Sequence, residues 1–162
     1  MSSGQGRAFF GPPEDGFVRG GAHLTVYLVP VVDGGLVVFD VEARQARGRW
    51  LPWDVLDFGQ NPYEAASALA DQWCNVPLRD LSLVDVMSLP VEGGGWELAI
   101  VFRGELVGVP PGDIHRKPVR FEPGQFDAIG QFDPVDIERW VSARSEVAAE
   151  PRDERPGGGL VF

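Results

Sequence analysis

The chain has 162 residues, of which 44% are hydrophobic and 23% charged, a composition typical of a globular domain. Its formal net charge of −10 argues against a nonspecific nucleic-acid binder, because phosphate backbones attract clusters of Lys and Arg. No apolar run approaches the roughly 20 residues that span a bilayer, and residues 1–7 lack the apolar core of a signal peptide. We therefore expect a soluble protein without membrane contact. Its expected parts are an irregular arm over residues 1–16, one domain over 17–145 and a flexible tail over 146–162.

The first half of the domain predicts strands. Residues 22–32 alternate and then become continuously apolar, which is typical of a strand. Asp33-Gly34-Gly35 is a turn signal ahead of Leu36-Val37-Val38-Phe39, so this region predicts a β-hairpin. A basic bend over residues 44–49 then leads to Trp50, and we interpret residues 53–58 as a loop.

A helix is predicted over residues 61–74. Asn61 is a favourable N-cap, Pro62 suits the first turn, and Glu64 at the third helical position completes a capping-box arrangement. The helix should end near Asn75-Val76-Pro77, because proline disfavours the helical conformation in the residue before it.

The second half predicts another hairpin and a second helix. Residues 81–89 and 96–103 read as strands on either side of a glycine-rich turn at 92–95. Residues 108–118, rich in Pro and Gly, read as a loop. Asp133 and Pro134 begin a helix over 134–143. In the tail, Leu160-Val161-Phe162 follows a Gly-rich linker, and we expect this apolar run to fold back on the domain or to cross to a second copy in a homodimer.

Several of these segments resemble the Nudix hydrolases. Trp50 and Leu51-Pro52 stand where that family has a Trp and a Leu-Pro-Gly-Gly, and the run from Gly59 to Ala66 is similar to its Gly-Glu-x-Pro-x-Glu-Ala-Ala. Gly130-Gln131-Phe132-Asp133-Pro134 is similar to an aromatic-Asp-Pro segment ahead of the family's last helix. The resemblance covers roughly residues 20–142. It implies an α/β (α+β) fold, a Nudix-type α/β/α sandwich with a mixed β-sheet.

The catalytic residues of that family are missing. With Gly59 in register, the Gly, Glu, Arg-Glu, Glu-Glu and Gly of the family signature become Asp54, Gln60, Ala68-Leu69, Gln72-Trp73 and Asn75. In the family these carboxylates hold magnesium, which needs anionic oxygen ligands. Leu69 and Trp73 provide no oxygen. We therefore expect no catalytic residues, no metal and no cofactor.

The sequence favours a binding domain instead. Apolar residues make the former metal site drier and less anionic, which suits a neutral or aromatic group, and a tryptophan can stack on a flat ligand. We expect either a small nucleotide-like ligand or a protein partner. The vestigial cleft would be lined by Trp53, Asp54, Asp57, Gln60, Leu69, Gln72 and Trp73, with Arg44, Arg47 and Arg49 as candidate anion contacts. The competing interpretation is that Trp73 only plugs the cleft.

A second alternative keeps an enzyme, a hydrolase of nucleoside diphosphate derivatives that uses magnesium or manganese. Its metal ligands would come from loops, through Asp54, Asp57, Glu92 or Glu97, with Glu64 as a further oxygen donor on the helix. Other reactive residue types have simpler interpretations. His23 and His115 lack partners at zinc-site spacing, and Ser67 has no motif of a nucleophile. Cys74 is the single cysteine, which excludes an intrachain disulfide and suits a cytoplasmic protein.

Overall fold

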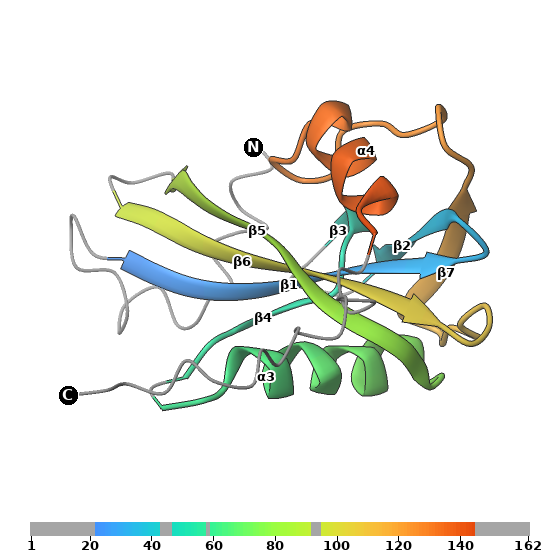
Figure 1. The fold of residues 1–162 in the computed structure, drawn as a ribbon, viewed down its shortest axis with the longest axis horizontal. Coiled ribbons are helices and arrows are strands. Elements are labelled where there is room, and N and C mark those ends of the chain that lie inside the picture. Colours follow the sequence, from blue (N-terminus) through green and yellow to red (C-terminus); the bar gives the residue numbers. More distant parts are fainter. Residues whose placement is uncertain (1–21, 43–46, 58, 92–94, 145–162) are drawn as a thin grey trace, which may run out of the picture.

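The structure is a computed structural model that describes residues 22–42, 47–57, 59–91 and 95–144. One mixed sheet of seven strands forms its centre, with a helix on each side (Figure 1). The strands are β1 (Ala22–Val32), β2 (Gly35–Glu42), β3 (Arg47–Trp50), β4 (Trp53–Val55), β5 (Leu78–Val91), β6 (Gly95–Leu106) and β7 (Arg116–Phe121). The helices are α3 (Pro62–Leu69), which continues as a π-helical turn over Ala70–Cys74, and α4 (Pro134–Ser142).

The sheet follows the order β3-β2-β1-β6-β5, with β4 paired to β1 and β7 paired to β2. β1 and β6 run parallel, in register from Ala22↔Trp96 to Val31↔Glu105, and the other pairs are antiparallel. A mixed sheet between helices confirms the predicted fold class. It also places the long β5 at one edge of the described sheet.

The β1–β2 turn has the geometry that its sequence predicts. Asp33 and Gly34 both have positive φ angles, 47° and 77°, as the two central residues of a type I′ hairpin turn require. Arg120 of β7 fastens the turn, since its Nε and Nη2 donate to the carbonyls of Val32 and Asp33, each at 3.0 Å. A Cβ on Gly35 would lie 2.5 Å from the Arg120 guanidinium carbon, so this contact requires glycine there.

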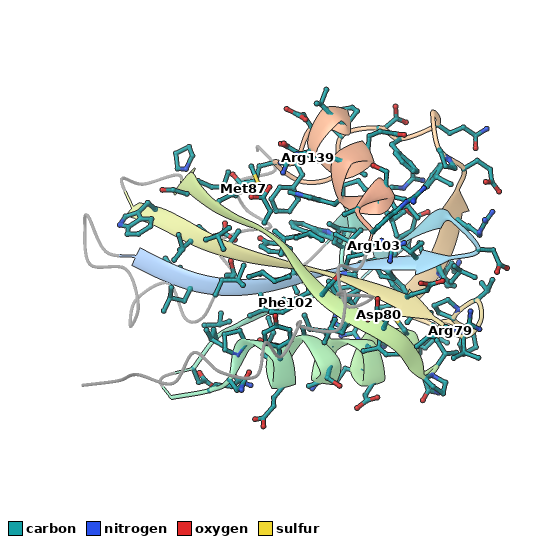
Figure 2. All side chains as sticks on the ribbon, in the orientation of Figure 1. Arg79, Asp80, Met87, Phe102, Arg103 and Arg139 are labelled. Carbon is teal, nitrogen blue, oxygen red and sulfur yellow. The ribbon has the colours of Figure 1, made fainter. Side chains whose placement is uncertain are left out.

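Strand alternation divides the core into two layers. In β1, Tyr27, Val29 and Val31 face α4, and Val26 and Leu28 face α3. Ile137 and Trp140 of α4 complete the first layer, whereas Ala66 and Leu69 of α3 complete the second. Figure 2 shows the same division, with Met87 on the α4 side of the sheet and Phe102 on the α3 side.

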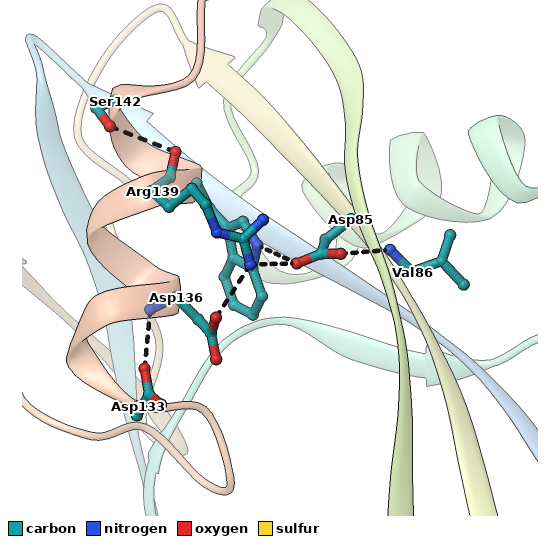
Figure 3. Close-up of polar contacts among 7 residues, drawn as sticks. Asp85, Val86, Asp133, Asp136, Arg139 and Ser142 are labelled. Carbon is teal, nitrogen blue, oxygen red and sulfur yellow. Dashed lines mark hydrogen bonds and ion pairs between the residues drawn. The ribbon is translucent and has the colours of Figure 1, made fainter.

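α4 is capped at its N-terminus and is fixed to the sheet near its C-terminal end. Asp133 caps it by accepting the Asp136 N–H at 2.9 Å, as predicted. Asp85 of β5 accepts Trp140 Nε1–H at 2.9 Å and the Arg139 guanidinium at 2.6 Å (Figure 3). Burial alone would raise the pKa of Asp85, but these hydrogen bonds and the Arg139 charge lower it. At the next residue, Arg103 Nε of β6 donates to the Val141 carbonyl at 3.1 Å.

Two predicted loops are wrong in part. Trp53–Val55, within the predicted loop 53–58, forms β4, and Arg116–Pro118, within the predicted loop 108–118, begins β7. Pro118 pairs with Phe39 in a strand whose other side has no partner among the described residues, and an edge strand tolerates proline. Both segments are strands because β1 and β2 offer backbone partners, which local composition does not reveal.

Some predictions fall outside this part of the chain. The arm, the tail, Arg44 and Glu92 lie outside the described residues, as does the side chain of Arg47. Within the described ranges, neither helix has the length and hydropathy that a bilayer crossing needs.

Candidate functional site

The box helix, α3 with its π-helical turn, begins as the sequence predicts. The Asn61 side chain accepts the Tyr63 N–H at 2.8 Å, and Pro62 occupies the first turn. Asn61 thus bonds the second helical N–H and not that of Glu64, and Glu64 makes no hydrogen bond back to Asn61 in the described structure, so the predicted capping box does not form. Ala65, Ala66 and Leu69 are buried against the sheet, and Leu69 is only 1% exposed. The apolar face of the helix therefore fixes its position.

The last turn of the box helix is wider than an α-helical turn. Residues 70–74 are π-helical, and the Asn75 N–H reaches back to the Ala70 carbonyl at 3.0 Å. Asn75 then ends the helix in the left-handed conformation, with φ 53°. A π-helical turn fits one extra residue into a helix and is frequent at functional sites. It shifts the directions of Gln72 and Trp73 relative to Leu69, so simple four-residue spacing does not describe this end.

Trp73 packs between the sheet and a basic side chain. Its ring meets Phe39 of β2 edge-on, at a centroid distance of 5.6 Å and an angle of 76°. The Arg116 guanidinium carbon lies 4.2 Å from the ring centroid, and Arg116 Nη1 donates to the Gln72 carbonyl at 3.2 Å. Trp73 is half-buried against the α3-side core. Leu69 and Trp73 are thus both held in place by apolar and aromatic packing.

The remaining residues of the predicted cleft divide into two groups. Leu69 and Trp73 pack in the α3-side core, whereas Trp53, which pairs with Tyr27 of β1, packs against both core layers and lies 6.4 Å from Trp50 between ring centroids. The polar members are exposed at the surface: Asp54, Asp57, Gln60 and Gln72. The structure thus places Leu69 and Trp73 in one core layer and leaves the polar residues on the outside.

Short-range hydrogen bonds hold the polar loop ahead of the box helix. Gln60 Oε1 accepts the Asp57 N–H at 3.2 Å, and the Gln60 N–H donates to the Asp57 carbonyl at 3.0 Å. Asp54 Oδ1 accepts the N–H of Val55 at 2.8 Å. No group of three or more His, Cys, Asp or Glu side chains suited to a metal occurs among the described residues.

Arg49 is the one candidate anion contact whose side chain the structure describes. Its Nε donates to Asp40 Oδ1 at 3.0 Å, and its guanidinium carbon lies 4.8 Å from the Phe121 ring centroid. Both contacts join β3 to β2 and β7. A ligand anion at Arg49 would have to share it with Asp40.

Glu97 occupies an environment that the sequence did not predict. It is fully buried, and its Oε1 accepts hydrogen bonds from Thr25 Oγ1 at 2.5 Å and from the Tyr27 hydroxyl at 2.6 Å. Gln131 Nε2 donates to Oε2 at 2.9 Å. Glu97 lies inside β6, two residues before buried Ala99 and four before buried Val101. Residues two apart in a strand face the same side, so this spacing could have indicated from the sequence that Glu97 is buried.

This position argues against one set of loop ligands. Glu97 shares the α4 face of the sheet with Ala99, whereas Asp54 pairs with Val26, which faces α3. Side chains of directly opposed residues lie on the same face of a sheet. The Glu97 and Asp54 carboxylates therefore lie on opposite faces of the sheet. Glu97, named above as a metal ligand from a loop, lies in strand β6.

The other reactive groups are placed as follows. Cys74 is fully buried, and burial raises the pKa of its thiol to about 12, which keeps it protonated and unreactive. His115 is exposed in the turn before β7, where Asp113 Oδ1 accepts its backbone N–H at 2.7 Å. Ser67 is exposed on the box helix.

A separate surface groove lies beside α4, on the opposite face from the box helix. Its volume is about 600 Å³, and Phe126, Val135, Glu138 and Arg139 are among its lining residues. Val135 is the most exposed apolar side chain of the groove, at 75%. None of the predicted cleft residues lines it.

Comparison with solved structures identifies the fold. A MutT Nudix hydrolase from Burkholderia pseudomallei matches with a TM-score of 0.60 and 17% identity, over 73% of this chain and 97% of that one. A Nudix hydrolase from Nitrosomonas europaea matches with a TM-score of 0.51 and 19% identity, over 62% and 72% of the two chains. The Bacillus subtilis pyrophosphohydrolase BsRppH matches with a TM-score of 0.50 and 15% identity, over 68% and 71%.

These likenesses show that the chain has the Nudix fold, as its sequence predicted. No protein-family profile matches the chain, and no curated protein sequence matches it. At identities below 20% the shared property is the arrangement of sheet and helices. What this chain does has to be argued from its own residues.

Proposed function

We propose that this Nudix-fold domain binds a small nucleotide-like ligand or a protein partner and does not act as a magnesium-dependent pyrophosphohydrolase. The observation that carries the proposal is the packing of Leu69 and Trp73. Leu69 is buried against the sheet, and Trp73 is enclosed between Phe39 and Arg116. Neither side chain has an oxygen to offer a hard cation, and both stabilise the fold in their present positions.

The exposed rim of the same helix supports a binding role. Gln72 presents an amide beside the half-buried Trp73, and Arg116 adds a fixed positive charge over the ring. An aromatic ring next to an amide and a guanidinium suits a flat group that carries an anion. The ligand would enter from the side of Gln72, at the C-terminal end of the box helix, without displacing Leu69.

A thermal-shift screen tests the binding role. Nucleotides, sugars and aromatic metabolites would be added to the wild type, to Trp73→Ala and to the matched control Trp73→Phe, which keeps a ring in the same place. A ligand of this site should raise the melting temperature of the wild type and of Trp73→Phe more than that of Trp73→Ala. Equal stabilisation of all three proteins would remove Trp73 from the site.

An activity assay separates the proposal from the hydrolase alternative. The pure protein would be incubated with magnesium or manganese and a panel of nucleoside diphosphate derivatives. We expect no release of phosphate or nucleotide above the buffer blank. Turnover that Asp57→Ala abolishes, and that Asp71→Ala on the box helix does not, would establish loop metal ligands and overturn the proposal.

A further inference from the structure

One end of the sheet has an apolar face on the α3 side. Leu24 and Trp96 are exposed there by 42% and 39%, and Leu83 and Val86 of β5 by 46% and 51%. The strand pairs place them in adjacent rows, because Leu24 pairs with Leu98, Val86 with Ile100 and Leu83 with Phe102. Tyr63, itself half exposed, extends this surface by meeting the Phe102 ring at 4.8 Å. We call the five exposed residues the edge patch: Leu24, Tyr63, Leu83, Val86 and Trp96.

The edge patch is exposed because the box helix stops short of it. Pro62 and Tyr63 are the first helical residues, and the helix runs from there beneath the middle of the sheet (Figure 1). Nothing among the described residues covers the outer part of β5 on this side. Five large apolar side chains in one place indicate a surface that another segment covers, whereas scattered single ones would need no explanation.

The C-terminal part of the sequence contains an apolar segment that suits this surface. α4 ends over the edge of the sheet, where Arg103 holds the Val141 carbonyl, and Arg103 pairs with Ser82 of β5. Ser82 directly precedes Leu83 of the edge patch. Residues 145–159 then lead to Leu160-Val161-Phe162. At roughly 3.3 Å per residue, this linker spans up to about 50 Å when fully extended.

We propose that Leu160-Val161-Phe162 docks on the edge patch of its own chain, after the linker passes around the outer edge of β5. The chemistry of the two surfaces matches, since a run of three large apolar residues meets an apolar face. Docking also covers Tyr63 and so ties the tail to the first turn of the box helix.

Cross-linking tests the docking directly. Val86→Cys combined with Phe162→Cys places one thiol on the patch and one on the segment, and Ile114→Cys with Phe162→Cys is the matched control. Ile114 is also apolar and is 82% exposed, but it lies before β7 and away from the patch. Native Cys74 is fully buried and does not interfere. A short bismaleimide reagent should close the first pair within one chain several-fold faster than the control pair.

Equal rates for the two pairs would overturn the proposal. Cross-linked dimers as the main product at low protein concentration would overturn it too, because the patch would then hold the segment of a second copy. A double-mutant cycle with Val86→Asp and Val161→Asp gives an independent readout. Docking predicts that each single change lowers the melting temperature by several degrees, and that the second change adds little to the first. Fully additive shifts would count against contact between the two residues.

Discussion

The Arg116 guanidinium carbon lies 4.2 Å from the centroid of the Trp73 ring, so a cation–π contact joins β7 to the box helix. Arg116 also donates to the Gln72 carbonyl in the last turn of that helix, where a positive charge complements the helix dipole. The two contacts hold the C-terminal end of the box helix against β7. The contribution of this contact to the free energy of unfolding can be measured with variants of Trp73 and Arg116.

Trp73→Ala should lower the free energy of unfolding by about 2–3 kcal/mol, because a half-buried ring that meets Phe39 would leave a gap. Trp73→Phe should cost about 1 kcal/mol, since a ring remains against the same partner. Urea unfolding followed by circular dichroism gives both values. A neutral effect of Trp73→Ala would mean that the ring does not hold this end of the helix.

Arg116→Gln should cost about 0.5–1 kcal/mol in the wild type, through the loss of its contact with the indole. In the Trp73→Ala background the same substitution should cost clearly less. A double-mutant cycle from the four urea curves isolates the interaction. Equal costs in both backgrounds would show that the cation–π contact adds nothing to stability.

Restoring one carboxylate should not restore a Nudix box. Leu69→Glu puts a charge where only 1% of the side chain is exposed, so it should destabilise the fold by several kcal/mol. Gln72→Glu lies on the exposed side of the helix and should fold normally. Magnesium titration followed by melting temperature compares the two. A well-folded Leu69→Glu protein that magnesium stabilises would show that the former metal site is still open.

Local signals predicted the helices of this fold well. Asn61 and Asp133 are N-caps with the expected hydrogen bonds, and Asp33-Gly34 forms the expected turn. Each of these depends on the few residues around it. The π-helical turn at residues 70–74 was not predicted, because its widening follows from packing Trp73 against Phe39 and Arg116, which are distant in sequence.

The candidate site was harder to predict than the fold. Leu69 and Trp73 were predicted to line a cleft, or in the case of Trp73 to plug it, and both pack against the core, but Arg116 was assigned only to the loop 108–118. Glu97 was assigned to a loop, whereas it is the buried centre of a network with Thr25, Tyr27 and Gln131. Its partners come from one neighbouring strand, β1, and from the loop before α4, and only the folded sheet brings them together.

Asp85 gives stability a pH dependence on the acid side. Its pKa is lowered in the folded protein. Burial by itself would raise the pKa, but the hydrogen bonds from Trp140 and Arg139 lower it by more. A lowered folded pKa means that the stabilisation is fully present above the unfolded value of 3.8 and is lost as pH falls through the folded value. Asp85→Asn should therefore be less stable than the wild type at pH 6, and the difference should shrink below about pH 4. Urea curves across pH 2.5–6 would contradict this if the difference stayed constant.

The Glu97 network should be sensitive to the loss of one donor. Tyr27→Phe removes the hydroxyl that Glu97 Oε1 accepts at 2.6 Å, and it leaves the ring against Phe132 in place. We expect a loss of about 1–3 kcal/mol, because a buried carboxyl oxygen loses one of its hydrogen-bond donors. Tyr63→Phe, at a half-exposed site, is the matched control and should change stability by less than about 0.5 kcal/mol. Equal effects of the two substitutions would show that the network contributes no more than a surface hydroxyl.

The raised pKa of the buried Cys74 thiol should make the fold less stable at alkaline pH. Burial raises the pKa of its thiol from 9.0 to about 12, so between these values the folded chain keeps a proton that the unfolded chain releases. Stability should therefore fall as pH rises above 9.0, and Cys74→Ala should remove this part of the slope. The comparison cancels the titration of other groups because both proteins share them. A thiol reagent at pH 8 should label the protein in urea and leave the folded chain unlabelled. Rapid labelling of the folded chain would mean that the end of the box helix opens readily.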